Sequence, residues 1–389
     1  MKNGHGSVGP RLFGDANTVG VQRALAEFHA GRPVMIHAGK EALVALPVDG
    51  ADADRIAAFR SLLHPRLPRL VITAHRARAL GLPTEPVLLE LDPDDDEESI
   101  FALAADADVD RKIAISPAGP AAIAAIELAK LVQRLPALLV ADAATVPEMT
   151  FDPPLVSVEA KAVGHFQRNI INSLTIAGEA RVPLQNGITT RVVVFRDAIG
   201  GSPVAIIVGQ PDFSRPMPVR LHSACLTGDV FGSRRCDCGD QLKLALTRLE
   251  EAGGGVILYL EQEGRGLGLA NKMRAYDLQD DGLDTVDANT TLGFDDDERD
   301  YGVAARMLEM LGCNRVVMLT NNPGKLAGVA GAGIEISGRM PLNTPINAHN
   351  RRYLSAMARR AGHLLDGVLA DGEAEASPAV HLRPERPVT

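Results

Sequence analysis

Residues 225–239 read CLTGDVFGSRRCDCG and hold three of the four cysteines of this 389-residue chain. Cys236 and Cys238 are two residues apart, so in a turn both sulfurs can face one point, and Cys225 can return to it across a glycine-containing loop. Zinc favours thiolates in a tetrahedral shell, and three protein ligands leave a fourth place for water. Bound zinc lowers the pKa of such a water towards ~7. The spacing therefore predicts one catalytic Zn²⁺ per subunit.

Other interpretations of this stretch remain open at this point. His222 could close the shell as a fourth ligand and make the site structural. The three thiols could also be unrelated and buried. Arg234 and Arg235 could hold the thiolates deprotonated, or bind phosphate or solvent. The fourth cysteine, Cys313, is predicted to be a small apolar residue at a helix end.

Composition narrows the class of protein. Hydrophobic residues make up 46% and charged residues 23% of the chain, which is typical of a globular protein. The formal net charge of −9 argues against broad nucleic-acid binding, which needs a basic surface. No apolar run reaches the ~20 residues that span a bilayer, and the N-terminus lacks the apolar core of a signal peptide. We therefore expect a cytoplasmic protein that binds neither nucleic acid nor membrane.

Hydrophobic patterning predicts an α/β protein with mixed sheets and two domains. The N-terminal half alternates strand-like runs, such as ALVAL at 42–46 and ALLV at 137–140, with a helix over 121–134. The C-terminal half repeats this pattern, with strands at 204–208, 256–260 and 316–319 and a helix over 241–252. An acidic run at 92–98 is predicted to be a solvated loop, with a carboxylate metal cage as the alternative. The expected organisation is a flexible arm (1–17), a domain (18–145), a linker (146–175), a second domain (176–368) and a disordered tail (369–389).

Several specific motifs follow one another in the C-terminal half. They are VRLHS at 219–223, CLTGD at 225–229, RCDCG at 235–239, QEGRG at 262–266, NKMRAY at 271–276, DERD at 297–300 and LTNNP at 319–323. Through their order and spacing, residues from about 180 to 365 strongly resemble GTP cyclohydrolase II, the first enzyme of riboflavin biosynthesis. The resemblance implies a C-terminal GTP cyclohydrolase II-like fold. It also implies zinc-dependent conversion of GTP and water to 2,5-diamino-6-ribosylamino-4(3H)-pyrimidinone 5′-phosphate, formate and pyrophosphate.

The same resemblance implies roles for individual residues. Cys225, Cys236 and Cys238 match the zinc ligands, Asp297 the general base, and Arg299 the residue proposed to attack the α-phosphorus. The positions that match nucleotide-binding residues are Arg220, Leu221, His222, Ser223, Ala224, Gln241, Glu263, Gly264, Arg265, Thr285, Thr320 and Lys325. A homodimer, and Mg²⁺ on the triphosphate of GTP, are also implied.

The chemistry of these residues is compatible with those roles. Arg220, Arg265, Arg299 and Lys325 could pair with phosphates. Glu263 could accept hydrogen bonds from N1 and N2 of guanine. The alternative for 297–300 is a solvated helix start with favourable N-terminal charges.

Tyr276 bears on how far the reaction goes. In the resembled family a Tyr here accompanies full turnover, whereas some relatives with Met stop at a formamidopyrimidine. Tyr276 could orient the second water, which releases formate. The alternative is a buried Tyr at a helix end, packed for its ring.

Two positions depart from the resembled family. Ala224 stands where a Glu is common, and Glu261 stands where many members carry Arg. Phosphate affinity is therefore open. The alternatives are a divergent relative that gives a formamidopyrimidine or acts on another nucleotide, and a non-catalytic GTP-binding scaffold.

The N-terminal half faintly resembles 3,4-dihydroxy-2-butanone-4-phosphate synthase at residues 23–34 and 119–141. The acidic loop of that family is replaced by HAGKEAL at 37–43, and its Gly-His-Thr-Glu motif by GPAA at 119–122. A Mg²⁺ enolisation site needs clustered carboxylates and a His. We therefore expect a degenerate synthase domain with a structural or regulatory role.

Overall fold

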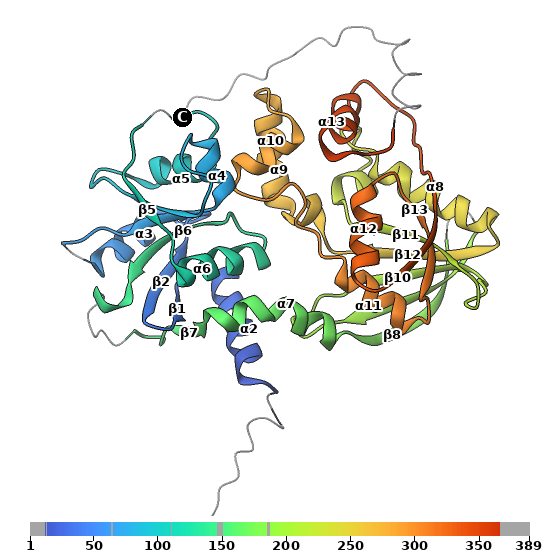
Figure 1. The fold of residues 1–389 in the computed structure, drawn as a ribbon, viewed down its shortest axis with the longest axis horizontal. Helices are drawn as coiled ribbons and strands as arrows, with labels where there is room; N and C mark the ends of the chain where they lie inside the picture. Colours follow the sequence, from blue (N-terminus) through green and yellow to red (C-terminus); the bar gives the residue numbers. More distant parts are fainter. Residues whose placement is uncertain are drawn as a thin grey trace, which may run out of the picture. The chain divides into compact units, whose positions relative to one another are not determined.

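The computed structural model describes residues 12, 14–63, 65–109, 111–145, 151–184 and 187–365. The chain divides into two compact units (Figure 1). The first unit takes residues up to 177 together with 195–202 and 261–306, and the second takes 178–194, 203–260 and the residues from 307 onwards. Each of two mixed sheets has seven strands, so the predicted two-domain α/β class is confirmed. The expected arm and tail lie largely outside the described residues.

The first sheet has the strand order β5-β4-β3-β6-β2-β1-β7. Its strands are antiparallel neighbours except for β1 and β7, which are parallel. From residue 16 to residue 173 the elements are α2 (Ala16–His29), β1 (Val34–Ala38), β2 (Glu41–Pro47), α3 (Ala53–Ser61), β3 (Arg69–Ile72), α4 (Ala74–Ala79), β4 (Val87–Glu90), α5 (Glu97–Ala105), β5 (Ile115–Pro117), α6 (Pro120–Leu131), β6 (Ala137–Asp142), the 3₁₀ turn Ala143–Thr145, β7 (Val156–Glu159) and α7 (Ala160–Ser173).

Helices cover both faces of this sheet, which explains why its strands are apolar without alternation. Along β6, Leu138 and Val140 pack with α2, α6 and α7, whereas Leu139 and Ala141 pack with α3, α4 and α5. Burying each large apolar side chain contributes roughly 1.5–3 kcal/mol. The two cores together fix the sheet between two layers of helices (Figure 1).

The structure differs from the sequence prediction over 146–175. Residues 146–150 lie outside the described part of the chain, but Val156–Glu159 forms β7, which pairs with β1, and Ala160–Ser173 forms helix α7. Only Val163, Phe166 and Ile170 of α7 are buried. Because most of the other residues of the helix are polar, its narrow apolar stripe is hard to recognise in the sequence. The expected domain bounds themselves stay a prediction.

The acidic run is also more ordered than expected. Asp96 forms a capping box with Ser99 at the start of α5, where negative charge favours the helix. Asp95 is buried, and its Oδ2 accepts a hydrogen bond of 2.9 Å from Arg111. The run therefore caps a helix and forms an ion pair, rather than a metal cage.

The second sheet has the order β14-β13-β11-β12-β10-β9-β8. β11 is parallel to β12 and β13, and β10 is antiparallel to β9 and β12. Ala245 and Leu249 of α8 pack in one core with Val208 and Ile257. The remaining elements are β8 (Thr175–Pro183), β9 (Thr189–Arg196), β10 (Val204–Gly209), β11 (Met217–Ser223), the π-helical turn η2 (Leu226–Val230), α8 (Cys238–Glu251), β12 (Gly254–Leu260), the 3₁₀ turn η3 (Glu263–Gly266), α9 (Leu269–Asp280), α10 (Thr285–Thr291), α11 (Gly302–Met310), β13 (Arg315–Leu319), α12 (Pro323–Gly331), β14 (Glu335–Met340) and α13 (Arg351–Ala361).

Residues 261–306, between β12 and β13, belong to the first unit. Leu267, Ala288 and Phe294 of this segment share a buried core with Ala105 and Leu135 of the N-terminal half. In Figure 1, α10 (orange) lies beside α4, and α9 lies beside α10. Among the described residues, no helix is long and apolar enough to cross a membrane.

Candidate active site

Three cysteine sulfurs meet in the second unit. Cys225 follows β11, Cys236 lies in the next turn, and Cys238 begins α8. Their Sγ atoms all lie within 4.8 Å of one another, and those of Cys225 and Cys236 are 3.7 Å apart. Zn–S bonds of 2.3 Å in a tetrahedron would separate two sulfurs by about 3.8 Å. The cluster therefore has the spacing of a metal site compatible with zinc, whereas a disulfide would need about 2.05 Å.

Two glycines allow this close approach. The Gly228 N–H donates a 3.3 Å hydrogen bond to Cys225 Sγ. A Cβ atom at Gly228 would lie 2.9 Å from Cys236 Sγ and 3.0 Å from Cys225 Sγ, and one at Gly239 would overlap the Gly228 carbonyl. The backbone can wrap around the three sulfurs only without these side chains.

The neighbouring thiols shift the pKa values of Cys236 and Cys238. Hydrogen bonding to Cys225 is the largest cause that raises the pKa of Cys236, to about 11, and it also raises the pKa of Cys238. Three neighbouring thiolates therefore need positive charge, which a divalent metal supplies. Cys238 also begins α8, where the N-terminal end of a helix favours negative charge.

His222 is held by Asp229 and is not a member of the cysteine group. Its Nε2 lies 3.0 Å from Asp229 Oδ1, and the ring is 1% exposed. Asp229 Oδ2 also accepts hydrogen bonds from Cys225 N–H (3.0 Å) and from the Tyr259 hydroxyl (2.9 Å). The interpretation of His222 as a fourth ligand is therefore not what the structure shows. Sequence reasoning missed Asp229 as the residue that holds the first ligand, although it lies within CLTGD.

Predicted nucleotide-binding residues of the second unit meet at the carboxyl ends of β11 and β13. Arg220, on β11, donates to the Leu319 carbonyl at 3.1 Å and to Gln241 Oε1. Lys325, on α12, donates to the Leu221 carbonyl at 2.8 Å. In α/β sheets, ligands bind at the carboxyl ends of parallel strands. These two buried cations therefore lie where an anionic ligand is expected.

Other predicted residues surround this pair. Thr320 follows β13, and its Oγ1 accepts from Asn322 N–H at 3.0 Å. Gln241 donates to Asp237 Oδ2 at 2.6 Å, and Thr344 donates to the same oxygen at 2.9 Å. Asp237, which lies between two of the cysteines, thus joins the cysteine turn to Gln241. Leu221, Ser223 and Ala224 lie on or directly after β11.

The remaining predicted residues belong to the first unit. Glu263 forms a 2.7 Å ion pair with Lys272, whose Nζ also lies 5.7 Å from the centre of the Tyr276 ring. Gly264 and Arg265 both adopt positive φ, of 62° and 64°, in a tight turn. Arg265 donates to Asp296 Oδ1 at 2.8 Å. Thr285 is the first residue of α10.

Asp297 and Arg299 form a bidentate ion pair. Arg299 Nε and Nη2 lie 2.6 and 2.5 Å from Asp297 Oδ1 and Oδ2, and the Tyr301 hydroxyl donates to Oδ2 at 3.1 Å. Burial alone would raise the pKa of Asp297, but the hydrogen bonds and charge of Arg299, together with the charge of Arg265, outweigh it and hold this pKa below its usual value. The Arg299 side chain is 8% exposed, and α11 begins only at Gly302. The pair is therefore not the solvated helix start considered above.

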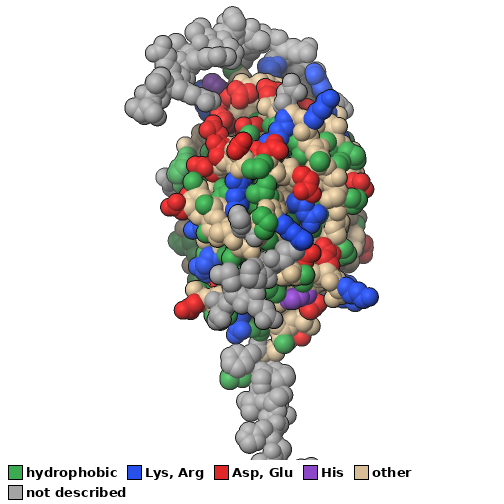
Figure 2. Space-filling view, turned by 90° about the vertical axis from the view of Figure 1, so that its left-hand side faces the viewer, with side chains coloured by type: hydrophobic (Ala, Val, Ile, Leu, Met, Phe, Trp, Pro, Cys, Tyr) green, Lys and Arg blue, Asp and Glu red, His purple; other side chains and the backbone are tan. Residues whose placement is uncertain are grey.

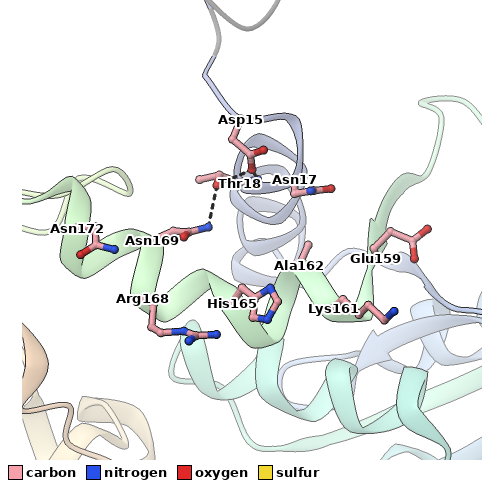
Figure 3. Close-up of a pocket in the computed structure, with 10 residues that line it drawn as sticks. All are labelled: Asp15, Asn17, Thr18, Glu159, Lys161, Ala162, His165, Arg168, Asn169 and Asn172. Atoms are coloured by element: carbon pink, nitrogen blue, oxygen red, sulfur yellow. Dashed lines mark hydrogen bonds between the residues drawn. The ribbon is translucent and has the colours of Figure 1, made fainter.

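A separate hollow of about 830 Å³ lies between α2 and α7 (Figure 3). Its lining is polar and includes His165, Arg168 and Asn169, with Asn169 donating to Thr18 Oγ1 at 3.2 Å. None of the sequence-predicted site residues lines it. On the face drawn in Figure 2, acidic and basic side chains are interspersed, with no broad basic region.

The two N-terminal stretches at 37–43 and 119–122 lie close together in the first unit. Residues of the 37–43 stretch form the end of β1 and the start of β2. The Glu41 carboxylate accepts a 3.1 Å hydrogen bond from Ala121 N–H at the start of α6, and a Cβ at Gly119 would lie 2.6 Å from Glu41 Oε2. Among the described residues, the cysteine cluster is the one metal-ligand group of three or more.

Comparison with known proteins agrees with this geometry. The family model of GTP cyclohydrolase II matches residues 175–341. The chain is 39% identical over 370 residues to the GTP cyclohydrolase-2 of Azospirillum brasilense, which covers 94% of this chain and 89% of that relative. It is 48% identical over 203 residues to the GTP cyclohydrolase-2 of Azotobacter vinelandii, which covers 52% of this chain and 97% of that relative. The riboflavin biosynthesis protein RibBA of Bacillus cytotoxicus is 42% identical over 256 residues, 62% of this chain and 64% of that protein.

The match to the Azospirillum relative extends over nearly the whole of both chains, and the family model spans all three cysteines and the Asp297–Arg299 pair. The chain therefore belongs to the GTP cyclohydrolase II family of enzymes.

Proposed function

We propose that this protein hydrolyses GTP to 2,5-diamino-6-ribosylamino-4(3H)-pyrimidinone 5′-phosphate, formate and pyrophosphate, with zinc as cofactor, as the first step of riboflavin biosynthesis. The observation that carries the proposal is the 3.7 Å sulfur spacing of the cysteine cluster, in a chain that belongs to this family. Cys225, Cys236 and Cys238 would hold the zinc, which would supply a water of lowered pKa for attack on C8 of guanine.

Arg220, Lys325, Gln241 and Thr320 would bind the nucleotide. Arg220 and Lys325 are buried cations, which suits them to a phosphate of GTP, with Mg²⁺ sharing the charge of the triphosphate. Gln241 and Thr320 lie beside them and can donate hydrogen bonds. The Ala224 departure removes a carboxylate next to the first cysteine, which lowers the negative charge that a phosphate would meet.

Glu263 would recognise the base, and Asp297, Arg299 and Tyr276 would take part in the reaction. Glu263 would accept from N1 and N2 of guanine, exchanging part of its ion pair with Lys272 for the base. Asp297, ionised at neutral pH, would act as the base, and Arg299 would act on the α-phosphorus as pyrophosphate leaves. The Tyr276 hydroxyl would orient the water that releases formate.

The test is an assay of the metal-replete protein with GTP, in which formate, pyrophosphate and the pyrimidine are measured separately. Formation of all three supports the proposal. Pyrophosphate without formate would show an incomplete reaction, and the absence of all three would contradict the proposal and favour the non-catalytic scaffold. The matched variants are Cys236→Ser, expected to lose formate release while sparing much of the nucleotide binding, and Cys313→Ser, expected to keep it.

We also propose that the N-terminal domain lacks synthase activity. A carboxylate of the chain itself, Glu41, lies at the start of α6, where the synthase motif is replaced. The purified protein should form no dihydroxybutanone phosphate from ribulose 5-phosphate. Clear formation of that product would refute this part.

A further inference from the structure

The segment 261–306 carries Glu263, Arg265, Tyr276, Asp297 and Arg299, yet it folds on the N-terminal half. Phe101, Ala105 and Leu135 bring apolar surface to it from the N-terminal half. From the segment itself come Leu267, Ala275, Ala288, Leu292 and Phe294. Because these side chains share one buried core, neither part can bury them alone.

Polar contacts fix the end of α10 against α4. Arg76 is 1% exposed and donates to the carbonyls of Ala102, Leu103, Asp106 and Thr291. Thr73 Oγ1 donates to the Gly293 carbonyl at 2.7 Å, and Gly293 has a φ of 86°. The turn that leads from α10 to residues 295–300 therefore has a fixed starting point.

A second set of contacts fixes α9. Asn271, fully buried, donates to the Gln133 carbonyl at 2.9 Å. Arg274 donates to Asp49 at 3.2 Å, and the same carboxylate pairs with Arg134. Asp49 thereby joins α9 to the end of α6.

One side chain of α6 reaches the stretch between Asp297 and Arg299. Lys130 Nζ lies 2.7 Å from Glu298 Oε1 and 3.3 Å from Asp295 Oδ2. The Lys130 and Glu298 side chains are each 16% exposed. Burial would lower the pKa of Lys130, but the charge and hydrogen bond of Glu298, together with the charges of Asp295 and Glu127, outweigh it and raise that pKa.

Glu298 is also tied into its own loop. Its carboxylate accepts from Asp295 N–H at 2.7 Å, and its backbone N–H donates to the Arg265 carbonyl at 3.1 Å. Asp297 and Arg299 are the two chain neighbours of Glu298, and Asp297 Oδ1 accepts from the Arg299 N–H at 3.2 Å as well as from its guanidinium. Holding Glu298 therefore restricts the short backbone segment to which both members of the pair are attached.

We propose that Lys130 of the N-terminal domain is a positioning residue for the cyclohydrolase reaction, which it serves by holding Glu298 and thereby the Asp297–Arg299 pair. The inference rests on the proposed function. The N-terminal domain would in this way have a role in catalysis, because its helix α6 supports the loop that carries Asp297 and Arg299. The relative from Azotobacter vinelandii matches only about half of this chain, so this support belongs to chains that carry the N-terminal half.

The test combines steady-state kinetics with hydrogen exchange of the full-length protein. Lys130→Met keeps the length of the side chain and removes its charge. It should lower kcat for pyrophosphate release by ~10–100-fold, the scale of a misplaced reacting group, with KM for GTP changed less than threefold. Amides of residues 294–300 should exchange faster, and zinc content should be unchanged. Lys130→Arg should restore most of kcat. Lys112→Met, an exposed lysine of the same domain, is the matched control.

A double-mutant cycle identifies the path of the effect. If Lys130 acts through Glu298, then Lys130→Met/Glu298→Gln should be no slower than the worse single variant. If the effects of the two substitutions on kcat were fully additive, Lys130 would not act through Glu298. If amide exchange of residues 294–300 were faster but kcat unchanged, Lys130 would have only a structural role. Unchanged exchange in Lys130→Met would overturn the inference altogether. A wild-type protein that releases no product would instead refute the proposed function, while the exchange experiment still decides whether Lys130 holds the loop.

Discussion

Cys225 and Cys236 place their sulfurs 3.7 Å apart, across a loop whose tightest point is Gly228. Gly228→Ala tests this relationship, because its new Cβ would lie 2.9 Å from Cys236 Sγ and 3.0 Å from Cys225 Sγ. We expect the sulfurs to separate and metal affinity to fall ~10–100-fold, as in substitutions that disturb the support of metal ligands. Metal content after dialysis against a zinc buffer measures it. Gly331→Ala, on α12 with no atom within 4 Å of its new Cβ, should retain full metal content.

The lowered pKa of Asp297 implies that its contribution to the stability of the folded protein depends on pH. Its pKa in the folded protein lies below the usual value of about 3.9, so its stabilising contribution is complete above that value and is lost as pH falls through the lower folded pKa. Asp297→Asn should therefore be less stable than wild type at pH 7, by about 1–3 kcal/mol. Thermal unfolding of both proteins should show the difference shrinking below pH 4. A difference that is constant from pH 7 to 3 would contradict this assignment.

Substitution of Tyr276 should affect the release of formate and the release of pyrophosphate differently. Tyr276→Met should leave ring opening and pyrophosphate release intact and abolish formate release. Tyr276→Phe keeps the ring that contacts Lys272 and removes only the hydroxyl, so it should behave like the Met variant if the hydroxyl orients the water. Separate assays of formate and pyrophosphate decide this. Equal formate yield from wild type and Tyr276→Met would show that Tyr276 has no role in formate release.

Substitution of the buried Arg76, far from the cysteines in the sequence, should strongly destabilise the folded protein. Arg76→Met removes the donor for four carbonyls in a buried place, so we expect the free energy of unfolding to fall by about 2–5 kcal/mol. Burial lowers the pKa of this guanidinium only to about 10, so it is charged at neutral pH. Chemical denaturation monitored by circular dichroism measures the change. Arg78→Met, exposed on the same helix, should stay within about 0.5 kcal/mol of wild type.

Local patterns predicted part of each sheet and missed several of its strands, such as β7 and β11. The run at 137–140 forms β6, and the predicted helix over 241–252 corresponds to α8. Such elements are readable because burial on two faces, or on one wide stripe, leaves long apolar signals. Helix α7 was missed because only three of its residues are buried and a Pro-containing stretch precedes it.

The site was predictable only where motifs are local. The cysteine spacing indicates a metal site, and the structure brings those sulfurs together. Asp229 was missed although it lies in a local motif, four residues from Cys225. Lys130 could not be predicted as a partner, because it meets Glu298 across 168 positions of sequence and no local period records that contact. The roles of Asp297, Arg299 and the nucleotide-binding residues stay predictions, to be tested by the variants above.

The placement of residues 261–306 also has a consequence for how the protein is made. Leu135 and Ala105 leave the ribosome early, but Leu267 and Phe294, which complete their core, follow more than a hundred residues later. By then the strands up to β12 have already been synthesised. Domains usually fold as units during synthesis, N-terminal first. The two cores that flank the first sheet need no residue beyond Ile170, whereas the core shared with residues 261–306 stays incomplete until Phe294 has been synthesised.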